Sequence, residues 1–368
     1  MSFSMVIGIV AVLATTACTL AGVFLVLRRM AMMADAISHA VLPGLVAGYA
    51  AAGGPHPAGA FAGAVVAGLL TVILVELLNR SRCMKEDAAI GIVFSALFAL
   101  GVFVVSQYYA NVHLDTDAVL FGEIAFTPFE TWQPGGRDLG PQAIWMLGGL
   151  TLLNALFLTL CYKELQLATF DPEFAAVQGF RPGLLHYALM VCVSLTAVGA
   201  FVAVGAILAV ALMIVPVVTA SLLTRRLPVL IGASLGVGAG SALIGCHLAL
   251  LWDLSIGGMI TVVLGGAFVA GLLFSPEQGL LAQALRLRRQ QERFAVQMLL
   301  IHLANHERTE AEPVECCLQH LHSDLRWSPA WIERVVRQAR NAGWVHQQGS
   351  ALLLTPSGRD QARMLAFL

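Results

Sequence analysis

Long apolar runs separated by short polar segments dominate the first three quarters of the chain. Each run is close to the roughly 20 residues that a helix needs to cross the hydrocarbon of a bilayer. Only a hinge at 199–205 separates the sixth and seventh runs, so the pattern predicts eight or nine membrane-spanning helices. The runs cover 5–27, 36–52, 59–78, 88–108, 143–162, 184–202, 204–223, 229–250 and 257–275.

Basic residues in alternate loops predict the orientation of these helices. Arginines and lysines follow the first, third, fifth, seventh and ninth runs. The intervening segments 53–58, 109–142 and 251–256 hold one basic residue, Arg137, among several acids. Because loops rich in Lys and Arg stay on the cytoplasmic side, we expect the N-terminus outside and the C-terminal segment in the cytoplasm.

The segment after the ninth run changes in character. An amphipathic helix is predicted over 291–307, a second stretch over 313–325, and a third helix over 328–343 that begins with a Ser cap and a Pro. Two short strand-like runs around a Gly-Ser turn and a last helix follow within 344–362. We therefore predict an all-α polytopic membrane protein with a small C-terminal α+β winged-helix-like domain. The expected parts are a transmembrane domain over 1–280, a basic linker over 281–290 and a cytoplasmic domain over 291–368.

Composition and missing motifs narrow the class of protein. The chain is 58% hydrophobic and 12% charged, about half the charged fraction of an ordinary soluble domain. Its seven cysteines contain no CxxC pair, so neither a disulfide framework nor a zinc finger is predicted. Because no HExxH or GxxxxGK[ST] motif occurs, we do not expect an enzyme. An energised role would need a separate ATPase chain.

Asp35 and His39 form the first candidate site. At positions i and i+4 they lie on one face of a helix. A carboxylate at membrane depth costs on the order of 3 kcal/mol, so it needs a partner or a water-filled path. One carboxylate and one imidazole suit Mn, Fe or Zn rather than Cu(I), and a symmetric pair of chains would supply four ligands. The alternative is that Asp35 caps the second helix and His39 is a satisfied interior histidine.

The loop over 162–183 is the second candidate. It lies on the basic side and contains a signal for a short helix, with Asp171 followed by Pro172 and Glu173. A short cytoplasmic helix between membrane spans can dock a partner. An ordinary connecting loop is the alternative.

A polar cluster within 107–124 is the third candidate, on the opposite side of the membrane. It could attract a cation or contact an outside partner, and a solvated acidic loop is the alternative. Its members are His113, Asp115, Asp117 and Glu123.

Glycines at helical spacing predict close contacts between helices. One pair, Gly44 and Gly48, lies in the second run, and Gly232, Gly236 and Gly240 lie in the eighth. We expect packing within the chain, and a seam between two chains is the alternative.

Four segments, taken in order, resemble a known family. They are "FLVLRRMAMMADAISHAVLPGLVAG" (24–48), "AVLFGEI" (118–124), "LATFDPEFAAVQG" (167–179) and "VGAILAVALMIVPVVTASLL" (204–223). They look like the permease subunit of the metal-type ABC importers, which move zinc, manganese or iron. The resemblance extends over 5–275.

This resemblance implies a homodimeric or paired permease in the bacterial plasma (inner) membrane. Two cytoplasmic ATPases and a metal-binding protein outside would be its partners, with a divalent metal ion as cargo and no permanently bound cofactor. Asp35 and His39 match the positions of metal ligands in the translocation path. The helix that couples the permease to the ATPase would hold Asp171, Pro172, Glu173, Ala175 and Gly179.

The tail over 291–368 departs from the family pattern and resembles the winged-helix half of iron-dependent-repressor-type regulators. Its third helix carries Arg334, Arg337 and Arg340, enough for phosphate contacts. Arginines and acidic residues nearly balance across the tail, so we expect a regulatory or packing module touching the ATPase, and no nucleic-acid partner. Two alternatives for the whole chain remain: a membrane-anchored metal-responsive regulator acting through this domain, and an ion-driven secondary carrier.

Overall fold

The computed structural model describes residues 3–52, 57–81, 84–108, 124–133, 139–276, 279–309, 315–325 and 327–366. The chain divides into two compact units, Met1–Gly279 and Leu280–Leu368. Each unit has a buried apolar core of its own.

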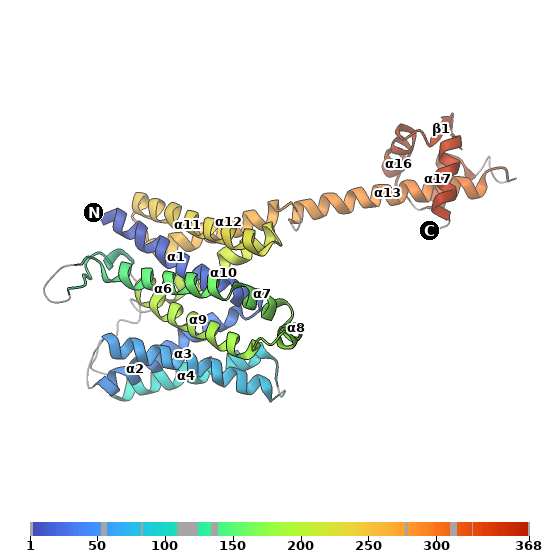
Figure 1. Cartoon of the computed structure of the whole chain (residues 1–368). Helices are drawn as coiled ribbons and strands as arrows, with labels where there is room; N and C mark the ends of the chain where they lie inside the picture. The colour runs from blue at the N-terminus through green and yellow to red at the C-terminus, as the bar shows by residue number, and fades with distance from the viewer. Residues whose placement is uncertain are drawn as a thin grey trace. The chain divides into compact units, whose positions relative to one another are not determined.

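The first unit is a bundle of long apolar helices (Figure 1). In the described part of the chain, nine helices are long and apolar enough to cross a membrane, which confirms the predicted polytopic fold. They are α1 (Phe3–Leu27), α2 (Ala31–Ala52), α3 (Pro57–Arg80), α4 (Glu86–Tyr108), α6 (Gln142–Leu160), α9 (Pro182–Val204), α10 (Ala206–Leu223), α11 (Leu227–Trp252) and α12 (Ile256–Phe274).

A single glycine explains why the sixth and seventh apolar runs form two helices, α9 and α10, rather than one. Gly205 has φ 84° and ψ 162°, a conformation that residues with a side chain rarely adopt. Its N–H donates to the Phe201 carbonyl at the end of α9, and its carbonyl accepts from the Ala209 N–H at the start of α10. One residue therefore ends one helix and starts the next.

The core of the first unit centres on α1. This helix packs against α6, α9, α10 and α11, and its Phe24 and Leu25 are fully buried. A second group is formed by α2, α3 and α4, with α2 packed against both of its neighbours. Contacts of α2 with α9 and α10 join the two groups. The helix that carries the first candidate site is thus held by packing on several sides.

The glycines of α2 make the close contacts that the sequence predicts. A side chain on Gly44 would clash with the Gly63 carbonyl of α3 and would lie 2.6 Å from the Ala67 Cβ. Gly48 approaches the backbone of Gly59 in the same way. The small residues therefore let two helix backbones touch.

The glycines of α11 do not behave as predicted. Among the residues that the structure describes, a Cβ on Gly232, Gly236 or Gly240 would meet no atom within 4 Å, so packing within the chain is wrong for this stripe. The close contact of α11 with α1 comes from Gly238, where a Cβ would lie 2.6 Å from the Thr15 Cγ2. Spacing alone could not tell which glycine face meets a neighbour.

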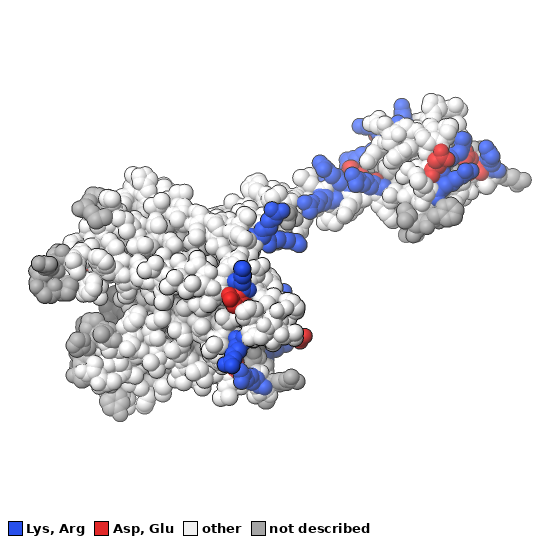
Figure 2. Space-filling model, in the orientation of Figure 1, with Lys and Arg blue, Asp and Glu red and all other residues white. Residues whose placement is uncertain are grey.

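Short elements connect the long helices. A 3-10 turn, η1 (Ile124–Phe126), precedes α6, and two short helices, α7 (Tyr162–Phe170) and α8 (Pro172–Val177), lie between α6 and α9. On the face of this unit seen in Figure 2, charged side chains gather at the end that carries α7 and α8. The rest of that face shows no charged side chain among the residues drawn as described.

The second unit combines helices with one hairpin. Residues 281–290, expected as a linker, lie inside its first helix, α13. Strands β1 and β2 pair antiparallel around a turn at Gly349, as the sequence predicts. The elements are α13 (Leu280–His306), α15 (Leu318–Asp324), α16 (Pro329–Asn341), β1 (Val345–Gln348), β2 (Ala351–Leu354) and α17 (Pro356–Ala366).

Candidate metal site

The start of α2 places Asp35 inside the helix. The turn after α1 contains Arg29 at φ 64°, and α2 then begins at Ala31. Asp35 is the fifth residue of the helix and follows the start by about 6 Å, since each residue rises about 1.5 Å. Asp35 therefore does not cap this helix, and that alternative is wrong.

Asp35 and His39 face each other on the open side of α2. His39 Nε2 lies 3.5 Å from Asp35 Oδ1. All the remaining residues from 33 to 41 are buried, whereas the side chains of Asp35 and His39 are 39% and 35% exposed in the single chain. The His39 ring also lies beside Phe94 and Phe98 of α4, at 5.4 and 5.9 Å between ring centroids. The pair thus projects from a packed helix without being enclosed by its own chain.

The distance between the two donor atoms suits a shared ion. Ligand atoms that each lie about 2.1 Å from one ion are about 3.0–3.4 Å apart in octahedral or tetrahedral geometry. The observed 3.5 Å needs only a small adjustment. An oxygen and a nitrogen fit Mn, Fe and Zn, but two ligands leave the shell of such an ion incomplete.

Pro43 adds a polar feature beside this pair. It lies inside α2, four residues after His39, and proline has no N–H to donate. The His39 carbonyl therefore lacks its ordinary helical donor. Inside a membrane, a carbonyl freed in this way is tolerated where another helix or water satisfies it.

A second group of polar side chains, which the sequence reasoning missed, joins α3 to α9. Glu76 Oε1 accepts hydrogen bonds from Arg80 Nε at 3.1 Å and Nη2 at 2.7 Å. Glu76 Oε2 lies 4.0 Å from His186 Nε2. The sequence did contain a signal for this group, because Glu76 and His186 are ionisable residues within apolar runs, and such residues mark candidate functional positions in membrane helices. Glu76 and His186 line a cavity of about 260 Å³ together with Met30, Met33, Val72, Val75 and Asn79.

Helix α8 begins with a complete N-terminal cap. Asp171 Oδ1 accepts from the Phe174 N–H at 2.9 Å, and Pro172 occupies the first turn, where a missing N–H costs nothing. Ala175 is fully buried, and Gly179 has φ 87° after the helix. The predicted short helix is present, with Glu173 exposed in its first turn.

Large apolar side chains around α8 are unusually exposed. Phe170, Phe174 and Val177 are 62%, 48% and 83% exposed. A hydrogen bond connects the preceding α7 to the turn after α1: Arg28 Nε donates to Thr169 Oγ1 at 3.1 Å. Burial lowers the pKa of the Arg28 guanidinium. A firmly anchored short helix with exposed apolar side chains has the character of a docking surface.

The remaining predicted site residues belong to two other segments of the chain. His113, Asp115, Asp117 and Glu123 lie outside the described residues. In the second unit the three arginines of α16 contact side chains of their own unit. Arg334 lies 3.7 Å from Glu292, Arg337 lies 3.0 Å from Glu333, and Arg340 donates to Gln347 at 3.1 Å.

The bundle of long apolar helices defines a polytopic membrane protein, and one of these helices carries the carboxylate–imidazole pair. The family follows from the sequence as a whole: a model of the ABC 3 transport family matches residues 2–275. The chain belongs to this family. The match lies within the first unit, so the second unit is an addition to the family domain.

Similar proteins with described roles extend the comparison. The chain is 42% identical to the zinc transport system membrane protein TroD of Treponema pallidum, over 98% of both chains. It is 45% identical to the manganese transport system membrane protein MntD of Bacillus subtilis, over 80% of this chain and 99% of MntD. Among solved structures, PsaBC from Streptococcus pneumoniae matches with a TM-score of 0.65 and 29% identity, over 78% of this chain and 96% of that chain.

Proposed function

We propose that the chain is the permease subunit of an ABC importer for divalent transition-metal ions, and that Asp35 and His39 bind the ion during its passage. The observation that carries this proposal is the pair on α2, where an oxygen and a nitrogen lie 3.5 Å apart. The printed names of the relatives add manganese and zinc transport, and an O/N donor set suits Mn, Zn and Fe alike.

A second permease subunit, identical or paralogous, completes the site in this proposal. In the single chain Asp35 is 39% exposed, and a carboxylate facing lipid at membrane depth is costly. Covering this face with the same pair from another copy would remove the carboxylate from lipid and raise the number of ligands from two to four. Four ligands are enough for a transient site for such ions.

Separate partners supply energy and cargo in this proposal. The sequence has no phosphate-binding loop of its own, so ATP hydrolysis is assigned to a cytoplasmic ATPase docked on α7 and α8, through Asp171, Pro172, Glu173, Ala175 and Gly179. The charged end of the first unit carries these helices, which supports a cytoplasmic position for them in the plasma membrane. An extracytoplasmic metal-binding protein would deliver the ion at the opposite end.

Metal uptake by cells that express the permease with its ATPase and binding protein tests the site. Asp35→Asn and His39→Ala should each lower uptake of radioactive manganese or zinc by about tenfold or more, since the first removes the negative charge of the oxygen ligand and the second removes the imidazole. Ser38→Ala is the matched control. It lies on the same turn, its hydroxyl only donates to the Ala34 carbonyl, and uptake should stay unchanged. Full uptake by both site variants, with normal amounts of protein in the membrane, would overturn the assignment.

Purified protein in liposomes separates this proposal from a secondary carrier. We expect no transport of the ion without the ATPase and ATP, and transport driven by an ion gradient alone would contradict the proposal. A regulator acting through the second unit finds no support in the names of the relatives, which describe transport proteins. We propose instead that the winged-helix-like unit, residues 280–368, is a cytoplasmic regulatory or packing module.

A further inference from the structure

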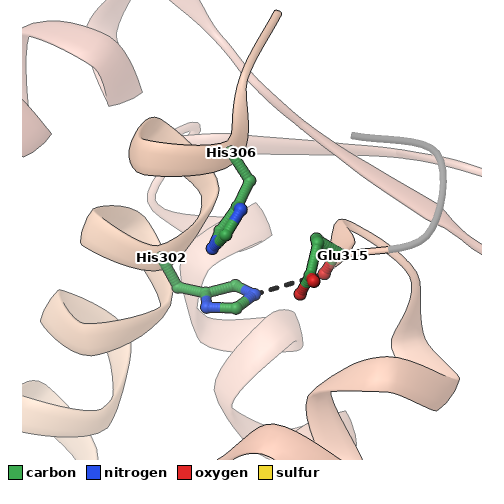
Figure 3. Close-up of side chains that lie close together, drawn as sticks. All are labelled: His302, His306 and Glu315. Carbon is green, nitrogen blue, oxygen red and sulfur yellow. Dashed lines mark hydrogen bonds between the residues drawn. The ribbon is translucent and has the colours of Figure 1, made fainter. Parts of the chain in front are cut away.

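We infer that His302, His306 and Glu315 form a site for a divalent transition-metal ion in the second unit. Each side chain offers one ligand atom, and these atoms all lie within 4.8 Å of one another. All three residues are partly buried, so the cluster is accessible to an ion yet sheltered from bulk water. Figure 3 shows the two imidazoles on α13 and the glutamate facing them from the segment before α15.

The two histidines stand one turn apart at the end of α13. His302 and His306 have the i, i+4 spacing that puts both rings on one helix face, and their ring centroids are 4.8 Å apart. Two histidines at this spacing on a helix are a recurrent way to hold a zinc ion. The neighbouring Glu307 has another role, because its carboxylate accepts from Arg359 Nε at 2.7 Å.

Glu315 is held in place by contacts on two sides. Its backbone carbonyl lies 3.2 Å from His302 Nε2, within hydrogen-bonding distance. Its carboxylate Oε2 lies 2.7 Å from His320 Nε2. A close polar partner of this kind helps to orient a metal ligand, so His320 is assigned as a positioning residue for the carboxylate.

The donor set indicates which ions fit. Two imidazoles and one carboxylate, with open positions for water, suit Fe, Zn and Mn. Ligand atoms around such an ion are about 3.4 Å apart, so side-chain rotation must bring the three groups together by about 1 Å or more. The bound ion would then fasten the end of α13 to the segment before α15.

The functional meaning of this site rests on the proposed function. If the first unit imports the ion and the second unit lies in the cytoplasm, the site meets the ion after delivery and can sense its concentration there. This site is separate from Asp35 and His39, which lie in the other unit. Binding at one site and transport through the other are therefore measured independently.

The test is metal binding by the full-length protein in detergent micelles. The Asp35→Asn, His39→Ala double variant serves as the background, so that the translocation pair does not contribute. Titration with Co²⁺, followed by visible absorption, and with Zn²⁺ against a chromophoric chelator should give a bound ion that is lost when His302→Ala and His306→Ala are added. Glu315→Gln, which keeps the volume, should weaken binding by about tenfold or more.

His346→Ala is the matched control. This histidine is exposed on β1 of the same unit, and its loss should leave the affinity unchanged. Thermal unfolding without metal verifies that the variants fold. An affinity unchanged by Glu315→Gln and by loss of both histidines would overturn the inference. Failure of the Asp35 and His39 variants to impair uptake would affect only the proposed function, because the binding assay does not depend on transport.

Discussion

Gly101 of α4 lies directly against the Pro43 ring of α2. A Cβ on Gly101 would lie 2.8 Å from the Pro43 Cδ and 2.9 Å from its nitrogen, well inside the 3.5–4.0 Å or so at which carbon atoms pack. The glycine thus lets α4 approach α2 at the proline, one turn after His39. Position 101 therefore supports the helix that carries the candidate metal ligands.

We expect Gly101→Ala to destabilise the protein and to reduce metal uptake. Overpacking at a tight contact costs about 1–3 kcal/mol, and the displacement falls on α2 beside His39. Gly91→Ala is the control on the same helix, because a Cβ there meets no described atom within 4 Å. That variant should be neutral or slightly more stable, since alanine favours a helix over glycine by about 1 kcal/mol. Equal thermal unfolding of the two variants in detergent would contradict the packing argument.

The cap of α8 yields a prediction about coupling to the ATPase. Asp171→Ala removes the acceptor for the Phe174 N–H and should cost about 1 kcal/mol of local helix stability. We expect weaker stimulation of the ATPase by the permease in reconstituted complexes. Asp171→Asn keeps a capping oxygen and should retain most of the coupling. If both variants lose coupling equally, the carboxylate acts through its charge and not as a cap.

A buried hydrogen bond links α6 with α9. Asn154 Nδ2 donates to Thr196 Oγ1 at 2.8 Å and to the Ala17 carbonyl of α1 at 3.2 Å. Thr196→Val preserves the shape and removes the acceptor, so we expect a loss of about 0.6 kcal/mol and at most about 1.7 kcal/mol, the average and the maximum for hydrogen bonds between membrane helices. Thermal or denaturant-induced unfolding in micelles measures this loss.

Thr159→Val provides the matched comparison for that change. Thr159 lies on α6 and is exposed, and its hydroxyl donates only to the Ala155 and Leu156 carbonyls of its own helix. Thr196 also makes such a local bond, to the Cys192 carbonyl. Both variants therefore lose a local bond and only Thr196→Val loses a contact between helices. Equal stability of the two would show that the contact contributes nothing measurable.

The hydrophobic pattern was sufficient to predict most of the fold. A membrane-spanning helix must form all of its backbone hydrogen bonds internally and stay apolar over a fixed length. The pattern could not place the start of α2 at Ala31, since the polar residues before 36 resemble a loop. It left the hinge near Gly205 open, because a helix break there depends on one backbone conformation. It also could not tell which glycine face of α11 meets α1.

The candidate site residues also divide into those that the sequence could predict and those that only the fold brings together. Asp35 and His39 were found because both lie on one helix at i, i+4. Glu76 and His186 were not linked, because they come from helices far apart in sequence and only the fold brings them together. The His302–His306 spacing was visible in the sequence, but Glu315 joins it only through the fold of the second unit. Sequence spacing thus finds ligands within one helix and misses those that tertiary structure adds.

The two units lead to a final prediction about a chain that ends at Gly279. The buried core of the first unit is built from residues between Val6 and Leu264, and the family match ends at 275. The alignment with MntD covers 99% of MntD but only 80% of this chain. We therefore expect the shortened protein to insert, to assemble with the ATPase and to import metal.

Its uptake should also respond less to metal accumulated in the cell, because His302, His306 and Glu315 are removed with the second unit. Uptake measured at low and high metal loading, in cells with the full and the shortened protein, reveals the difference. Loss of all uptake despite normal insertion would show that the second unit is part of the transport machinery. Identical responses to loading would instead remove any sensing role from its metal site.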